Sequence, residues 1–293
     1  MFVKKDDLRG LPLHASQISY FDCERKLALY ILCKVKAIKI PLYENKHLLA
    51  GNVLHAILQD TFRWFNFPLV EHFYYNKKNS VEDSLKKAFF YQYDKWKNLF
   101  DLQIPSSLWM NDPSSIDDVH NKVINQIDNL AKLASTLVKE TDDMIESQVL
   151  GEEFHLSYNL KNALLIGNID ILARTNKPKL FRLIELKTGN RYSSDEIQLK
   201  IYGEVFRKSF PEYELKLELW HPNYVKKIKK EFKLSQNDEV LPKIENLVER
   251  VMKISKIKDL PPEKDNSYYC NKICKFCKDY IPEIFNIDSF SDY

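Results

Sequence analysis

The sequence predicts a mixed α/β protein, in which a mainly helical N-terminal part precedes a core of strands and helices. Apolar residues recur at helical spacing through most of residues 1–150. Short β-type runs bounded by turn residues begin after Gly151 and alternate with helical segments. The 293 residues are 44% hydrophobic and 29% charged, which suffices for a packed core and is unlike a disordered chain.

Four helical segments are expected in the N-terminal part. Ser16 can cap the first of them, and the second places its apolar residues at i, i+3, i+4 and i+7. The turn-forming run at 111–115 contains a proline and separates the last two segments. The expected helices are residues 18–31, 54–65, 81–100 and 116–150.

The second half of the chain alternates between strand and helix patterns. The helix in its middle begins with the capping-box form Ser193-x-x-Glu196. The expected strands are residues 154–160, 163–173, 180–186, 214–220 and 227–234, and the expected helices begin at 193 and span 240–257. This order predicts a core of the form ββ(β)αββα.

Composition and motif content argue against several classes of protein. No apolar run approaches the roughly 18 residues of a membrane span, and the start lacks the apolar stretch of a signal peptide, so we expect a cytoplasmic protein. The six glycines fit neither G-x-G-x-x-G nor G-x-x-x-x-G-K-[ST], the usual phosphate cradles. The net charge of +3 is uninformative about DNA, but five lysines between residues 226 and 233 form a basic patch that suits a phosphate backbone or a solvated strand end.

The strongest chemical pattern lies between residues 167 and 202. Asp170 lies on an otherwise apolar strand, and Glu185 and Lys187 lie on the next one, where alternation points both the same way. If the strands are neighbours, the three side chains converge. Two carboxylates and a nearby backbone carbonyl suit Mg²⁺ or Mn²⁺, and a lysine beside them can orient water or offset negative charge. The alternative is a surface salt bridge on an exposed strand face.

Two further features accompany this pattern. Gln198 and Tyr202 form an i, i+4 pair on the following helix, and His55 lies four residues after Gly51 in an upstream helix. D-x(14)-E-x-K followed by Q-x-x-x-Y, with an upstream G-x-x-x-H, resembles the RecB-type branch of the PD-(D/E)xK nucleases. Ile169 stands where the name-giving motif of the family has proline, a substitution that is frequent in this branch.

The resemblance implies a restriction-endonuclease-like core, with a mixed central sheet flanked by helices, and a role for each matching residue. The implied ligands of a catalytic Mg²⁺ or Mn²⁺ ion are His55, Asp170, Glu185 and the backbone carbonyl of Leu186. Lys187 would serve the attacking water, whereas Gln198 and Tyr202 would help to place the DNA strand.

The five cysteines form a poor disulfide framework and a better metal-ligand pattern, because their number is odd and three are packed into eight residues. Cys270, Cys274 and Cys277 are close enough in sequence to bind one metal ion or cluster. Cys23 and Cys33 are the candidates for a fourth thiolate. Thiolate spacing alone does not separate zinc from an iron–sulfur cluster.

The residues around Cys23, from Ser16 to Arg25, resemble the S-x-x-x-x-x-x-C-x-R/K start of the iron–sulfur RecB-like nucleases. In that group one N-terminal cysteine joins three C-terminal ones around a [4Fe–4S] cluster. The implied cluster ligands are Cys23, Cys270, Cys274 and Cys277, with zinc as the alternative occupant and Cys33 as a buried spare.

The closest resemblance is to the CRISPR-associated nucleases that trim DNA ends before spacer integration; the exonuclease V group shares the one-plus-three cysteine plan. It implies a metal-dependent exonuclease for single-stranded or frayed DNA, with CRISPR integrase proteins as candidate partners and the oligomeric state open. A non-catalytic DNA-end-binding scaffold and a zinc-bound interaction module are the rival hypotheses. The expected parts are a helical part at 1–150 with an insertion at 66–150, a nuclease core at 151–258 and an iron–sulfur C-terminal segment at 259–293.

Overall fold

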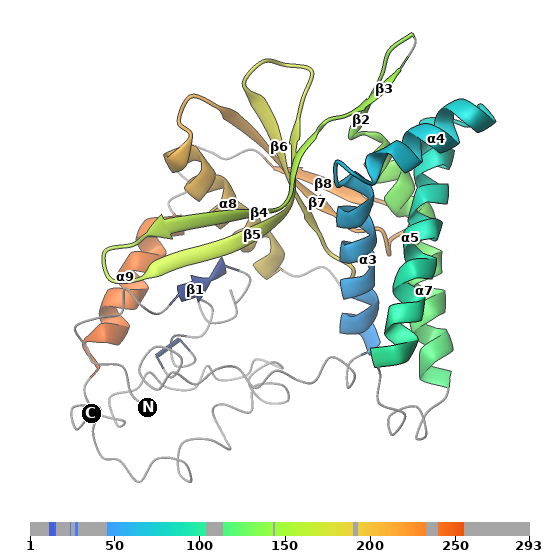
Figure 1. Cartoon of the computed structure of the whole chain (residues 1–293). Coiled ribbons are helices and arrows are strands. Elements are labelled where there is room, and N and C mark those ends of the chain that lie inside the picture. Colours follow the sequence, from blue (N-terminus) through green and yellow to red (C-terminus); the bar gives the residue numbers. More distant parts are fainter. Residues whose placement is uncertain are drawn as a thin grey trace.

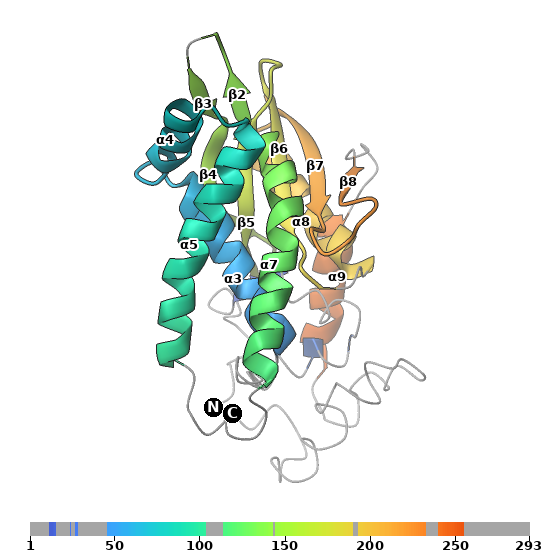
Figure 2. The ribbon, with the colours of Figure 1, turned by 90° about the vertical axis from the view of Figure 1, so that its right-hand side faces the viewer.

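A six-stranded sheet forms the centre of the protein, and helices cover both of its faces (Figures 1 and 2). This computed structural model describes residues 12–15, 24, 27–28, 46–103, 114–142, 144–189, 193–232 and 240–254. Within these ranges, no helix combines the length and the apolar character needed to cross a membrane.

The strands of the central sheet run in mixed directions. They are β1 (Pro12–His14), β4 (Val149–Asn159), β5 (Leu164–Arg174), β6 (Leu180–Leu186), β7 (Glu214–Trp220) and β8 (Lys229–Phe232). β5 is antiparallel to β4 and β6 but parallel to β1, and β7 is parallel to β6 and antiparallel to β8. The parallel pair β6–β7 requires a crossover, which the helix α8 (Ser193–Ser209) provides.

One edge of β5 is divided between two partner strands. β6 pairs with residues 171–174 of this edge, and β1 pairs with residues 164–166. β4 covers the opposite edge along nearly the whole strand. In the described part of the chain, residues 167–170 therefore have no paired strand on the divided edge, and this gap in pairing leaves an opening between β6 and β1.

Four helices form a layer over one face of the sheet. They are α3 (Lys46–Phe62), α4 (Phe67–Lys77), α5 (Val81–Gln103) and α7 (Ser114–Ser135). Their apolar side chains share one core with Ile171, Ile184 and Trp220 of the sheet. The stripe that α7 contributes follows helical spacing and contains Val119, Val123, Ile127, Leu130 and Ala134.

The opposite face of the sheet is covered by α8 and by α9 (Val240–Met252). Their core includes Leu172, Leu183 and Leu217 of the sheet. The two helices are also joined by a polar contact, because Glu204 Oε2 on α8 accepts the backbone N–H groups of Val240 (2.8 Å) and Leu241 (3.0 Å). This carboxylate satisfies donors at the start of α9 and fixes where that helix begins relative to α8.

The mixed α/β class predicted from the sequence is confirmed. β6 and β7 have the predicted bounds, and α8 begins at the predicted residue. β4, β5, β8 and α9 differ from the predicted ranges by a few residues at their ends. These elements were accessible to sequence reasoning because each is a strongly apolar or periodic run between turn residues.

Two expectations for the N-terminal part are wrong, and one further strand was not predicted. The helix predicted for 116–150 ends at Ser135, and a two-stranded hairpin of β2 (Val138–Glu140) and β3 (Ile145–Ser147) follows it. The polar run between these strands interrupts the helical period. The helix predicted for 54–65 begins earlier and ends at Phe62, and a separate helix, α4, begins at Phe67 with Pro68 in its first turn. The three-residue strand β1 was not predicted. Most of the helix expected at 18–31 lies outside the described residues.

A buried ion pair connects the sheet to the helical layer. Arg182 on β6 donates to both carboxylate oxygens of Glu218 on β7, at 2.9 and 2.8 Å, and Glu218 is 0% exposed. Nη1 of Arg182 donates to the backbone oxygen of Thr136, just after α7 (2.7 Å), and Nη2, which also donates to Glu218, donates to the Thr136 hydroxyl (2.9 Å). Trp220 Nε1 also donates to Glu218 (3.0 Å), so the buried charges are fully surrounded by partners.

Replacing Arg182 by methionine is expected to lower the free energy of unfolding by about 3–5 kcal/mol, because it leaves the Glu218 carboxylate buried without its counter-ion. Urea denaturation measures the change. The matched control is Lys161→Met, which removes the exposed Lys161–Glu249 pair (2.8 Å) and should change stability little. Equal effects of the two substitutions would contradict this role for Arg182.

Candidate active site

The predicted carboxylates meet at the opening in the edge of β5. The β5–β6 register pairs Ile171 with Ile184, so the next step along the strands sets Asp170 opposite Glu185. Asp170 Oδ2 accepts the backbone N–H of Leu186 (2.7 Å), and Asp170 Oδ1 lies 3.0 Å from Nδ1 of His55 on α3. Asp170 therefore joins β5, β6 and α3 at one point.

The second carboxylate is held from the other side by α8. Glu185 Oε1 accepts hydrogen bonds from Lys187 Nζ (2.9 Å) and Gln198 Nε2 (3.0 Å). Lys187 Nζ also donates to Gln198 Oε1 (2.8 Å), and Gln198 Nε2 lies 2.8 Å from the Tyr202 hydroxyl. The backbone N–H of Lys187 donates to the carbonyl of Trp220 on β7 (2.8 Å), which fixes the end of β6.

Two glycines allow the flanking helices to come this close. A Cβ atom on Gly167 would lie 2.3 Å from the Tyr202 ring, and one on Gly51 would lie 2.5 Å from Thr188 Oγ1. Both distances are shorter than real carbon contacts. Any side chain at Gly167 would push α8 and its tyrosine away from β5, and one at Gly51 would crowd the segment just after Lys187.

Burial and neighbouring charges drive the two carboxyl groups apart in acidity. Burial and the charge of Asp170 raise the pKa of Glu185 to about 7. Burial alone would raise the pKa of Asp170 as well, but His55 and the Leu186 N–H reverse this and lower it. The pKa of His55 is raised, because the attraction of Asp170 outweighs burial, which opposes protonation. Such a pair of close buried carboxylates favours a bound cation.

The donor atoms at this point suit a divalent metal. One imidazole and two carboxylates provide the nitrogen and oxygen donors that Mg²⁺ or Mn²⁺ accepts. Glu185 Oε2 is buried and has no hydrogen-bond partner among the described residues, so it is the oxygen most in need of a ligand. His55 and Glu185 Oε1 are instead engaged with neighbouring side chains, and no set of three or more described His, Cys, Asp or Glu residues has the arrangement of a metal centre.

The structure brings six of the predicted site residues together: His55, Asp170, Glu185, Lys187, Gln198 and Tyr202. Leu186 joins them through its N–H group. All five cysteines, Cys23, Cys33, Cys270, Cys274 and Cys277, lie outside the described residues. The contact of Trp220 with Lys187 was not predicted, because nothing in the local sequence signals a partner supplied by parallel strand pairing.

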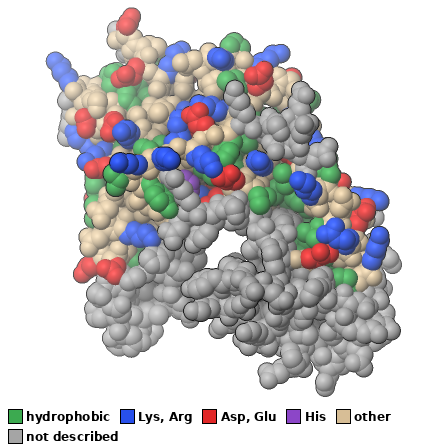
Figure 3. Space-filling model, turned by 180° about the vertical axis from the view of Figure 1, so that it is seen from behind, with side chains coloured by type: hydrophobic (Ala, Val, Ile, Leu, Met, Phe, Trp, Pro, Cys, Tyr) green, Lys and Arg blue, Asp and Glu red, His purple; other side chains and the backbone are tan. Residues whose placement is uncertain are grey.

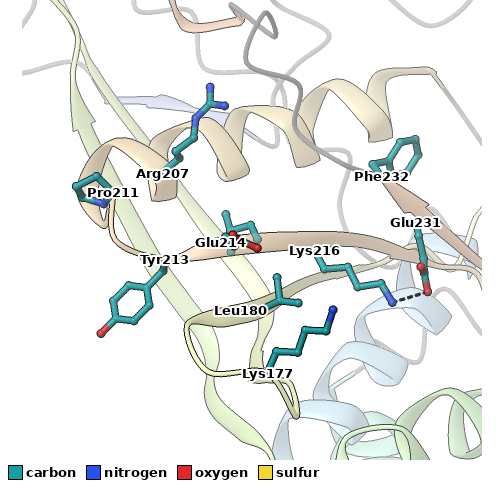
Figure 4. A pocket seen from close by; sticks show the side chains of 10 residues that line it. Lys177, Leu180, Arg207, Pro211, Tyr213, Glu214, Lys216, Glu231 and Phe232 are labelled. Carbon is teal, nitrogen blue, oxygen red and sulfur yellow. Dashed lines mark ion pairs between the residues drawn. The ribbon is translucent and has the colours of Figure 1, made fainter.

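A groove of about 750 Å³ lies at the amino-terminal ends of β6 and β7 (Figure 4). It is lined by Leu180 and Glu214, which begin β6 and β7, whereas Glu185 lies near the carboxyl end of β6. Lys216 points into this groove and pairs with Glu231 (2.9 Å). This groove is therefore separate from the carboxylate site.

The family model described as the PD-(D/E)XK nuclease superfamily matches residues 15–278. The chain belongs to this superfamily. Its members are generally metal-dependent nucleases. The site described above lies inside the matched residues.

A solved structure described as the crystal structure of SSO0001 is also similar to this chain. The two are 17% identical, with a TM-score of 0.27, and the match covers 46% of this chain. It covers 65% of that chain, which is less than two thirds of its length. A comparison with curated proteins finds no match. Family membership therefore rests on the family model.

Replacing Glu185 by glutamine is expected to stabilise the protein when no divalent metal is added. The folded-state pKa of about 7 lies above the ordinary 4.5, so stability from the protonated carboxyl is present below about pH 4.5 and is lost as the pH rises through 7. Glutamine does not titrate. The gain in unfolding free energy should therefore be about 2–3 kcal/mol larger near pH 8 than near pH 4.5.

Urea denaturation at the two pH values measures this difference. Glu212→Gln, in an exposed turn, is the control and should show no pH-dependent gain. A gain for Glu185→Gln that is equal at both pH values would contradict the raised pKa.

Proposed function

We propose that this protein is a metal-dependent DNA nuclease of the RecB-like, iron–sulfur branch of the superfamily. One observation carries the proposal: a histidine from α3, His55, contacts Asp170 of the D…ExK motif, while α8 places Gln198 against Glu185. An upstream histidine and a downstream Q-x-x-x-Y helix are the features that the RecB-type resemblance adds to the minimal motif. The complete set of polar residues favours an enzyme over a non-catalytic scaffold.

His55, Asp170, Glu185 and the Leu186 carbonyl would hold Mg²⁺ or Mn²⁺, which supplies Lewis-acid polarisation of the scissile phosphate and of a water molecule. The chain itself contributes position and charge. Asp170 is kept ionised by His55 and the Leu186 N–H, and it keeps β6 and α3 in register around the reacting group.

Lys187 would orient the attacking water and offset negative charge that develops on the phosphate. Its ammonium is held between Glu185 Oε1 and Gln198 Oε1, so its direction is set by two acceptors. The attraction of Glu185 outweighs burial and raises the pKa of Lys187, which keeps the lysine a cation and a proton donor. Gln198 and Tyr202 would position the DNA strand from α8.

We further propose a [4Fe–4S] cluster on Cys23, Cys270, Cys274 and Cys277. One described contact supports this placement: Glu24, the residue after Cys23, pairs with Arg250 on α9 (3.0 Å). α9 is the last described helix before the three C-terminal cysteines. Glu24, next to Cys23, is thus in contact with the helix that precedes the three C-terminal cysteines. The cluster would stabilise the fold by linking the two ends of the chain.

The proposed reaction is hydrolysis of phosphodiester bonds at single-stranded or frayed DNA ends. We assign it to the trimming of DNA before CRISPR spacer integration, because the arrangement of motifs most closely resembles that of the nucleases that perform this trimming. A repair role of the exonuclease V type would use the same site and the same cysteine plan. The added helices α4, α5 and α7 lie in the insertion at 66–150 that the sequence resemblance does not explain.

Glu185→Ala and Lys187→Ala are each expected to reduce cleavage of single-stranded DNA by about 100-fold or more, because each removes a charge placed at the reacting phosphate. The assay uses 5′- and 3′-labelled DNA with Mg²⁺ or Mn²⁺, so that the products also report polarity. Glu212→Ala and Lys177→Ala remove the same charges at exposed positions and serve as controls. Metal-dependent cleavage that survives both site substitutions would refute the assignment.

Cys23→Ala is expected to lower the iron and acid-labile sulfide content of the purified protein and its visible charge-transfer absorbance, because a cluster ligand is lost. Cys33→Ala is the matched control and should leave all three unchanged. Zinc in place of iron, or an unchanged cluster in Cys23→Ala, would contradict the proposed ligand set.

A further inference from the structure

We propose that a cleft between α7 and the loop after β7 binds one base of a single-stranded DNA substrate and favours bases that carry an exocyclic amino group. This inference rests on the proposed nuclease function, because it assigns one base of the DNA substrate to a cleft at the same end of the sheet as Glu185 and Lys187. It goes beyond that function by giving the protein a preference among bases.

The cleft has the size and the lining of a site for a polar planar ligand. Its volume is about 520 Å³, within the range of about 300–1,000 Å³ that is typical of ligand sites. Five of its nine lining residues are amides: Asn121, Asn125, Gln126, Asn129 and Asn223. Side-chain amides offer a donor and an acceptor in one plane, which is how proteins read base edges.

The cleft lies beside the proposed catalytic segment. β6 and β7 are parallel, and the loop that forms one wall of the cleft leaves the carboxyl end of β7, next to the end of β6. Asn223 Nδ2 in this loop donates to the carbonyl of Gly189, two residues after Lys187 (2.8 Å). Carboxyl ends of neighbouring parallel strands are where open α/β sheets bind ligands. A DNA strand held at Glu185 and Lys187 can therefore pass this cleft.

The opposite wall is held rigidly against the loop. Asn129 Nδ2 on α7 donates to the carbonyls of Pro222 (2.8 Å) and Tyr224 (3.1 Å). Asn125 and Asn121 lie one and two helical turns earlier on α7, respectively, and are exposed. The cleft is thus preformed, with exposed amides at its mouth.

Two acceptors at the cleft lack donors. Gln126 Nε2 donates to the carbonyl of Lys122 (3.2 Å), and Asn223 Nδ2 donates to Gly189, so each amide has a fixed orientation. Their oxygens, Gln126 Oε1 and Asn223 Oδ1, are buried and have no partner among the residues that the structure describes. An unpaired buried acceptor lowers the stability of the fold, and a ligand that brings N–H donors would remove this free-energy penalty.

The chemistry of these acceptors selects among bases. Adenine, cytosine and guanine carry an exocyclic amino group that donates, whereas thymine presents a carbonyl oxygen and a methyl group in its place. Lys226 is exposed on the loop, so a cation is available for the phosphates, and Lys122 and one acid, Asp118, also line the cleft. Basic side chains gather in a band across the middle of the face seen in Figure 3.

The test measures binding of labelled dT strands of about 12 nucleotides without added divalent metal, by fluorescence anisotropy. A single dC or dA replaces dT at successive positions from the end. The wild type should bind about tenfold more tightly when the replacement occupies one particular position. Gln126→Leu should reduce this preference to less than about twofold while retaining affinity for plain dT. Asn125→Ala, at the exposed mouth, should also weaken it without a risk to folding.

The matched control is Gln92→Leu. Gln92 is another buried glutamine with an unpartnered Oε1, but it lies on α5 and does not line the cleft, so the preference should persist. Binding and cleavage without any base preference, or a preference that both Gln126→Leu and Asn125→Ala leave intact, would overturn the base site and leave the nuclease proposal standing. A wild type that neither binds nor cleaves DNA would overturn both.

Discussion

The arrangement of the site depends on how one edge of β5 is shared. β6 occupies part of that edge and β1 another part, and the residues between them carry Asp170. If β6 continued along β5, backbone pairing would close the opening. The short strand β1 takes part of the edge that β6 leaves and so bounds the opening on its other side.

The two helical layers serve this opening in different ways. α3 brings His55 to Asp170, and α8 brings Gln198 and Tyr202 to Glu185. Each layer is fixed to the sheet by apolar packing and is reinforced by a buried charged group. On one face this is Arg182 with Glu218, and on the other it is Glu204 of α8, which accepts N–H groups at the start of α9. Rigid supports of this kind keep polar side chains in place where no strand pairing does so.

Much of the core followed from local sequence. β6 and β7 are apolar runs between clear turns, and Asp170, Glu185 and Lys187 have a spacing that places them on neighbouring strands. The sequence did not indicate that α7 ends at Ser135, because apolar residues continue into β2 at nearly the same density. It also gave no sign of the Arg182–Glu218 pair, whose members lie 36 residues apart and meet only through the parallel crossover.

The site residues outside the D…ExK pattern were found in another way. His55 has no periodic signal of its own and was chosen through the family resemblance. The asparagines of the amide-lined cleft do have a periodic pattern, but it does not indicate a site. Asn121, Asn125 and Asn129 have the i, i+4 spacing of an ordinary solvated helix face. Only the position of the loop after β7 distinguishes them from such a face.

The unpartnered oxygen of Glu185 has a consequence for laboratory evolution. A buried carboxylate with one oxygen that lacks a donor is expected to make the chain less stable than variants that have lost it, so folding and the proposed activity favour different residues at this position. A library of variants sorted by heat resistance alone would become enriched in proteins that have lost Glu185. Under the proposed nuclease function, selection must therefore include cleavage at every round to retain this residue.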